Sequence, residues 1–229
     1  MKPVLVRQHV ESAPAGILAA WLAARGLPYE IDRSWLGARP DPEDYAFVAS
    51  LGHDKMAGDL HDPAVAAERE LIARAVEADV PVLGLCYGGQ VLAAVFGARV
   101  GPAPVPELGW RTIETDDPAL VPAGPWLEWH FERFEVPPGA VELARTPHAP
   151  QAFRIGPHLG VQFHPEATVG IVAGWARADA PRLAELGIDD PDALLAAPRA
   201  VLDAGEEVAF RLFDAFLAQA DQSDQRLAS

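Results

Sequence analysis

The sequence predicts an α/β fold with three layers and a mostly parallel sheet, on two observations. Short apolar runs alternate with segments of helical spacing through the first hundred residues. Such alternation of strand and helix is typical of a parallel sheet covered by helices on both faces. Half of the 229 residues are hydrophobic, which is enough for a sizeable core and is not the composition of a disordered chain.

The first half of the chain supplies these elements in order. Strands are expected where the apolar runs are short, at residues 3–7, 28–32, 45–51 and 80–85. Helices are expected where apolar residues recur at helical spacing, at residues 14–25, 63–78 and 87–96. Gly26 and Gly97 follow two of these helices, as glycine often does at a helix C-terminus. Together the elements predict a flavodoxin-like arrangement.

The pattern changes after Gly101, where Pro and Gly recur between shorter apolar runs. We expect antiparallel strands, added to the parallel core, at residues 110–114, 126–129, 141–144, 151–155 and 159–163. Helices return at residues 168–177, 180–186 and 198–220, and the last either covers the sheet or forms a dimer contact. Without a linker or repeat, the sequence favours one domain over residues 1–229, with a core at 1–170 and a helical extension at 171–220.

Composition and charge exclude several classes of protein. A formal charge of −15 argues against nucleic acid and against an anionic membrane surface as partners. No basic and apolar leader opens the chain, and no apolar stretch is long enough to span a bilayer.

A single cysteine suits a reducing compartment, so we expect a cytoplasmic location. We expect no cofactor. We also expect no metal site, because the polar loop at residues 53–62 fits no strong metal-ligand spacing. The core most simply includes Trp110, Trp126, Trp129 and Trp175.

The only cysteine, Cys86, lies between an apolar run and a helical segment, in Gly84-Leu85-Cys86-Tyr87-Gly88-Gly89-Gln90. A sharp turn between strand and helix is how α/β enzymes present a nucleophile. The helix N-terminus would favour the thiolate. The backbone N–H of Tyr87 would point at a developing oxyanion. The alternative is a structural cysteine in the core, which the surrounding glycines make less favourable.

A thiol nucleophile needs a base, and His164 is the best placed of the seven histidines. It ends an apolar run in Gln162-Phe163-His164-Pro165-Glu166. Glu166 could accept a hydrogen bond from the imidazole and stabilise the imidazolium, which would complete a Cys-His-Glu triad. The alternative is the surface end of a strand that carries His and Glu by chance.

The two motifs together resemble the class I glutamine amidotransferases, and most closely the stand-alone, GMP-synthase-like members. In those, a Trp-His strand and a Phe-Glu-x-Pro-Pro-Gly turn precede the His-Pro-Glu motif. This chain has Trp129-His130-Phe131, then Phe134-Glu135-Val136-Pro137-Pro138-Gly139. It also has Gln151-Ala152-Phe153-Arg154 where such proteins commonly read Gln-Ala-Phe. The resemblance covers most of residues 1–167.

The resemblance implies a reaction and roles for residues. Cys86 would attack the γ-carboxamide of glutamine and form a thioester, and His164 would pass the thiol proton to the departing ammonia. Water would then release glutamate. Gln90 and His130 would contact the substrate. If the ammonia is donated, the acceptor would be a separate synthetase subunit.

One departure from the family pattern lies after the third strand. The family usually has Gly-Gly or Gly-Pro-Gly there and uses an amide of that turn as the second oxyanion donor, whereas this chain has Gly52-His53. Gly52 would supply the donor, and His53 either contacts the substrate or weakens the oxyanion hole. Two alternatives therefore stay open: a stand-alone hydrolase of γ-glutamyl peptides or amides, and a catalytically weak binding or regulatory module.

Overall fold

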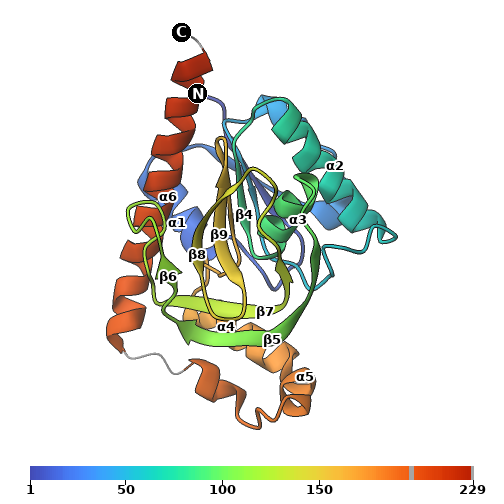
Figure 1. Ribbon diagram of the computed structural model, residues 1–229, viewed down its shortest axis with the longest axis vertical. Helices are drawn as coiled ribbons and strands as arrows, with labels where there is room; N and C mark the ends of the chain where they lie inside the picture. Colours follow the sequence, from blue (N-terminus) through green and yellow to red (C-terminus); the bar gives the residue numbers. More distant parts are fainter. Residues whose placement is uncertain (196–198, 228–229) are drawn as a thin grey trace.

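The computed structural model describes residues 1–195 and 199–227, and its centre is a mixed eight-stranded sheet (Figure 1). Five strands are parallel and lie in the order β2-β1-β3-β4-β10. Their bounds are β1 Val4–Gln8, β2 Tyr29–Arg33, β3 Val48–Ser50, β4 Val82–Leu85 and β10 His158–Val161. This is the strand order of flavodoxin-like sheets, in which ligands bind at the carboxyl ends of the strands. The predicted fold class is confirmed.

Three antiparallel strands extend the sheet beyond β10. They are β9 (Pro150–Ile155), β8 (Val141–Arg145) and β6 (Glu114–Thr115). The prediction that the run at residues 159–163 is an added antiparallel strand needs correction. Its strand, β10, pairs in parallel with β4 on one side and is antiparallel only to β9 on the other. All four of its residues are buried, as expected for a central strand.

A second sheet contains only β5 (Val100–Arg111) and β7 (Trp126–Phe134), paired antiparallel. The predicted strand at residues 126–129 lies in this ribbon and does not extend the main sheet as expected. The one predicted at residues 110–114 is divided, because residues 110–111 end β5 and Glu114 begins β6 of the main sheet. The reason is packing. Leu127 and Trp129 of β7 are buried against Val172 and Trp175 of a following helix, which covers the ribbon.

Helices cover both faces of the main sheet (Figure 1). Their bounds are α1 Gly16–Ala24, α2 Pro63–Glu77, α3 Tyr87–Val95, α4 Val169–Ala178, α5 Ala180–Glu185 and α6 Arg199–Leu227. Short 3-10 turns span Ser34–Leu36, Pro42–Asp44 and Pro191–Leu195. On one face α2 and α3 pack in one core cluster, and on the other α1 and α6 pack in a second.

The last helix, α6, covers the sheet, which was one of the two alternatives for this segment. Its Phe213 and Phe216 are fully buried beside Trp21 and Phe47. Asp214 accepts a hydrogen bond from the Trp21 indole at 2.8 Å. Pro198, the predicted first residue of this helix, lies outside the described residues. Among the helices that are described, none combines the length and apolar character needed to cross a membrane.

Candidate active site

Cys86 occupies a sharp turn between β4 and α3. Its φ is 50°, in the left-handed region that residues other than glycine rarely adopt. Its N–H donates to the Val161 carbonyl at 2.9 Å, which ties the turn to β10. Glycine is required beside it, because a Cβ on Gly84 would lie 2.5 Å from the Gly88 carbonyl oxygen. A backbone held in a rarely adopted conformation, as at Cys86, is typical of residues at functional sites.

The N-terminus of α3 offers free backbone donors next to this thiol. Tyr87 is the first residue of the helix, where an N–H has no acceptor within the helix. In the part of the chain that the structure describes, no backbone carbonyl outside the helix accepts a hydrogen bond from it. The N–H of Gly88, by contrast, donates to the Leu51 carbonyl at 3.2 Å. The Tyr87 amide is therefore available to an oxyanion at Cys86.

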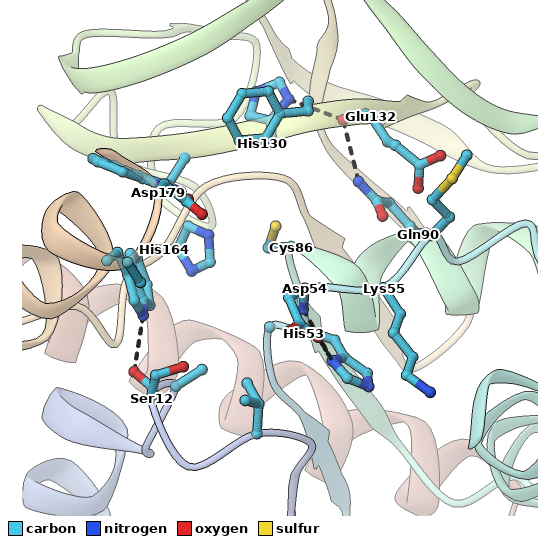
Figure 2. A pocket seen from close by; sticks show the side chains of 18 of the residues that line it. Ser12, His53, Asp54, Lys55, Cys86, Gln90, His130, Glu132, His164 and Asp179 are labelled. Atoms are coloured by element: carbon cyan, nitrogen blue, oxygen red, sulfur yellow. Dashed lines mark hydrogen bonds and ion pairs between the residues drawn. The ribbon is translucent and has the colours of Figure 1, made fainter. Parts of the chain in front are cut away.

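His164 lies beside Cys86 and is fixed in place by its neighbours (Figure 2). Its Nδ1 is 2.7 Å from Oε1 of Glu166, and both side chains are buried. Its backbone N–H donates to the Leu127 carbonyl at 2.9 Å, and its ring lies 4.6 Å from the Trp175 ring. The Glu166 contact favours a proton on Nδ1, which leaves Nε2 for exchange of a proton with Cys86.

The electrostatic setting favours the charged form of the His164 imidazole. Burial lowers the pKa of His164, but its electrostatic interactions and hydrogen bonds with Cys86 and Glu166 outweigh burial and hold this pKa well above its usual value. A thiolate and an imidazolium side by side are the reactive form of a cysteine nucleophile paired with a base.

Two glutamine side chains line the other side of Cys86. The Gln162 amide nitrogen lies 3.7 Å from the Cys86 sulfur, as a donor. The Gln90 amide donates to the Glu132 carbonyl at 3.2 Å and lies 3.4 Å from Gln162 Oε1. This chain of amides connects the sulfur to the edge of β7. The Gln90 amide nitrogen is therefore already hydrogen-bonded within the protein.

His130, on β7, is held by two buried carboxylates. Its Nδ1 donates to the Glu132 carbonyl at 2.9 Å, and its Nε2 lies 3.2 Å from Glu128 and 3.5 Å from Glu107. Burial lowers the pKa of His130, but these carboxylates outweigh it and raise the pKa to about 9. Both ring nitrogens are engaged inside the protein, so a substrate contact would involve only the ring carbons.

The turn after β3 lies against the imidazole of His164. A Cβ on Gly52 would be 3.1 Å from His164 Cε1, so a glycine here leaves room for the ring. The His53 ring turns away from Cys86 (Figure 2), stacking on His9 at 5.5 Å and meeting Tyr87 edge-on at 5.1 Å. Its Nδ1 accepts a hydrogen bond from the Asp54 N–H at 2.9 Å. Neither Gly52 nor His53 has a positive φ, so the histidine fits this turn without backbone strain.

These side chains surround one cavity of about 290 Å³, close to the lower end of the range for small-molecule sites. Of the predicted site residues it is lined by Gly52, His53, Cys86, Gln90, His130 and His164. Tyr87 and Glu166 are buried and do not line the cavity. Figure 2 shows His164, Asp179 and Ser12 on one side of Cys86, with Gln90 and Glu132 on the other. Within the described residues, no group of three His, Cys, Asp or Glu side chains could hold a metal ion.

Residues 56–172 match the sequence model of the family "Glutamine amidotransferase class-I". The chain belongs to this family. The match is 117 residues long, counted from its two ends, and so covers just over half of the 229 residues. It includes both Cys86 and His164.

Curated relatives of this glutamine amidotransferase include GMP synthases. The glutamine-hydrolysing GMP synthase of Aeropyrum pernix is 37% identical over 134 residues, which are 55% of this chain and 25% of that protein. A glutamine-hydrolysing GMP synthase subunit of Ignicoccus hospitalis is 40% identical over 95 residues, which are 38% of this chain and 50% of that one. The matched region thus spans a quarter of the first of these two relatives and half of the second.

Two solved structures resemble this amidotransferase over nearly its whole length. A glutamine amidotransferase from Thermotoga maritima superposes with a TM-score of 0.84 at 25% identity, covering 94% of this chain and 97% of that one. A glutamine amidotransferase from Methylobacillus flagellatus gives a TM-score of 0.81 at 26% identity, covering 96% and 95%.

The sequence did not point to several residues that line this amidotransferase cavity or contact its cysteine. They are Ser12, Glu132, Gln162, Trp175, Asp179 and Arg182. Gln162 immediately precedes Phe163-His164, so its position at the end of a strand was a usable signal. Trp175, Asp179 and Arg182 come from α4, α5 and their junction, and only the tertiary structure brings these helices to Cys86.

Proposed function

We propose that this chain hydrolyses the γ-carboxamide of glutamine to glutamate and ammonia. The Cys86 sulfur attacks the γ-carbonyl carbon, and the C–N bond breaks as His164 gives a proton to the departing ammonia. The product is a γ-glutamyl thioester. His164 then takes a proton from a water molecule, which attacks the thioester and releases glutamate and the Cys86 thiolate.

The observation that carries this proposal is the alignment of three side chains. Cys86 is presented on a strained turn, His164 lies beside it, and Glu166 holds the His164 ring at 2.7 Å. The Glu166 carboxylate orients the His164 imidazole, and this imidazole exchanges a proton with the Cys86 sulfur and with the leaving group. In this proposal Tyr87 and Gly52 supply the amides of the oxyanion hole.

The fate of the ammonia belongs to the same proposal. The two GMP synthase relatives described above are longer than the region they share with this chain. We infer that the ammonia passes to a separate synthetase subunit. We also propose a single amidotransferase domain in a reducing compartment such as the cytoplasm, where the Cys86 thiol stays free.

A second candidate function is hydrolysis of γ-glutamyl peptides or amides. The observation in its favour is that the cavity is also lined on the His164 side of Cys86, by Ser12 and Asp179 (Figure 2). The leaving group receives its proton on this side, so the extra space would accept an amine larger than ammonia. The Cys86 and His164 chemistry would be the same.

A substrate panel tests both functions. Purified protein is given L-glutamine and several γ-glutamyl amino acids, and glutamate, ammonia and released amine are quantified. Glutamate and ammonia from glutamine, absent in Cys86→Ala, support the amidotransferase. Turnover of γ-glutamyl amino acids in preference to glutamine supports the second function instead. No turnover of any substrate contradicts both and favours a binding or regulatory module.

A further inference from the structure

Three aromatic rings pack together beside the turn that follows β3. The His53 ring stacks on the His9 ring, with centres 5.5 Å apart and planes 11° apart. The Tyr87 ring meets both of them edge-on, at a centre-to-centre distance of 5.1 Å in each case. His9 directly follows β1, and Tyr87 is the first residue of α3. The rings therefore join the two segments that carry the proposed oxyanion donors.

His9 is the fixed member of this cluster. Its Nε2 lies 3.1 Å from Ser50 Oγ, and the Ser50 hydroxyl donates to Glu68 at 2.8 Å. Because that hydroxyl proton goes to Glu68, the His9 proton is on Nε2 and is donated to Ser50. His9 Nδ1 then accepts from the Ser34 hydroxyl at 3.3 Å. Glu68 also accepts from the buried Arg7 at 2.9 Å, so the His9 ring is held by a network inside the fold.

The turn itself is held mainly through the His53 side chain. Leu51 is anchored, because its N–H donates to the Arg7 carbonyl at 3.1 Å and its carbonyl accepts from the Gly88 N–H at 3.2 Å. Among the described residues, neither Gly52 nor His53 makes a backbone-to-backbone hydrogen bond. The His53 side chain is only 7% exposed. Its ring contacts are therefore the main tie between this turn and the rest of the fold.

Burial keeps the two stacked rings neutral near pH 7. It lowers the pKa of His9 to about 4, although the Glu68 charge opposes it. It also lowers the pKa of His53, against the charge of Asp54. Two neutral rings stack without charge repulsion, so the stack belongs to the protein at the pH at which the proposed reaction runs.

We propose that His9 and His53 are positioning residues, whose stacked rings set where the turn presents its N–H beside Cys86. The network around His9 fixes one ring, the stack fixes the other, and the second ring fixes the turn. The His53 ring lies on the side of the turn away from Cys86 (Figure 2). The histidine that replaces the family's usual glycine thus supports the oxyanion hole. This inference rests on the proposed function, to which it adds two positioning residues.

A return to glycine at position 53 tests the inference by the sign of its effect. If histidine weakens the oxyanion hole, His53→Gly raises kcat. If its ring holds the turn, His53→Gly lowers kcat, and we expect a fall of about 10- to 100-fold, as for a misplaced catalytic group. His53→Phe keeps a ring for the stack and should retain most of the wild-type kcat. The control is His61→Gly, at an exposed histidine of the same loop that does not line the cavity, and its kcat should not change.

Two further measurements separate a misplaced oxyanion donor from a general loss of structure. Alkylation of Cys86 by iodoacetamide is a displacement at carbon that forms no oxyanion, so His53→Gly should react at the wild-type rate. The Kd of L-glutamine, measured in a Cys86→Ser background so that nothing turns over, should also be unchanged by His53→Gly.

A double variant tests whether the two rings act as a pair. His9→Leu removes the ring and its hydrogen bonds, and should lower kcat while the alkylation rate stays the same. Combined with His53→Gly, it should lower kcat no further than the slower single variant does, because the stack can be lost only once.

The outcomes distinguish this inference from the proposed function. It is overturned, with the proposed function left standing, by a wild-type or higher kcat in His53→Gly, by equal losses of kcat and of alkylation rate, or by additive losses in the double variant. Absence of turnover in the wild-type chain overturns the proposed function and the inference with it.

Discussion

Gly52 lies directly against His164, and a Cβ added to Gly52 would be 3.1 Å from Cε1 of the imidazole. The turn after β3 and the proposed base are thus in contact. The φ of Gly52 is not in the left-handed region, so this glycine is needed for space and not for backbone conformation. The contact with His164 limits position 52 to glycine. The ring of His53, the next residue, turns away from Cys86 and is not limited in this way.

We predict that Gly52→Ala lowers kcat by about 10-fold or more, because the methyl group displaces a ring that must reach both the thiol and the leaving group. The melting temperature should change little. The control is Gly174→Ala, since a Cβ on Gly174 would meet nothing within 4 Å. A Gly52→Ala protein with wild-type kcat would show that the turn and the imidazole are not functionally coupled.

Replacement of Glu166 should alter both the rate and its pH dependence. Glu166 helps to keep the pKa of His164 high, so in Glu166→Gln that pKa falls. The imidazolium is then lost at lower pH, and the alkaline limb of the pH–rate profile moves to lower pH. We expect kcat to fall by about 10⁴-fold, as in a triad whose orienting carboxylate is neutralised.

The control for this variant is Glu77→Gln, an exposed carboxylate near the end of α2. Its profile should match that of the wild type. An alkaline limb at the same pH in Glu166→Gln would contradict the role assigned to Glu166, whatever the change in kcat.

The buried His9 makes the stability of the fold sensitive to acid. Burial lowers the pKa of His9 to about 4, although the neighbouring Glu68 charge opposes this. In the unfolded chain the pKa returns to about 6.5, so between pH 6.5 and about 4 the unfolded state binds a proton that the folded state does not. The free energy of unfolding therefore falls as the pH falls through this range, by up to about 3 kcal/mol from His9.

Denaturant unfolding at a series of pH values measures this effect. His9→Gln keeps a side chain that can hydrogen bond to Ser50 but cannot titrate, so its stability should fall less steeply between pH 6.5 and 4. His61→Gln, at an exposed histidine, should keep the wild-type slope. If His9→Gln also has the wild-type slope, His9 does not carry the pH dependence.

Much of the fold was predictable because its signals are local. The alternation of apolar runs and helical spacing gave the parallel strands and helices of the first hundred residues. The turn at Cys86 was visible because the backbone packing there requires Gly84 and Gly88, whose added Cβ atoms would lie 2.5 and 2.1 Å from carbonyl oxygens. Because these two positions have no room for a side chain, the glycines in the sequence already indicate the tight turn.

Other features were not predictable, because they depend on partners distant in the sequence. In sequence, β5 and β7 look like antiparallel strands that extend the main sheet. Only the packing of Trp129 against α4 shows that they form a separate ribbon. Charged residues such as Arg7 and Glu68 look solvent-exposed in sequence, yet Arg7 Nε donates to Glu68 at 2.9 Å in the interior. The place of Arg182 at the cavity likewise follows from tertiary structure alone.

The central claim is that Cys86 attacks a γ-glutamyl carbonyl with the help of His164. The most direct measurement is the intact mass of the protein after incubation with an electrophilic glutamine analogue, followed by peptide mapping, which is unambiguous because the chain has one cysteine. We predict a single adduct on Cys86, prevented by excess L-glutamine and formed much more slowly in His164→Ala. An adduct that forms equally fast with glutamine present and in His164→Ala, or turnover of glutamine by Cys86→Ser at the wild-type rate, would contradict the account.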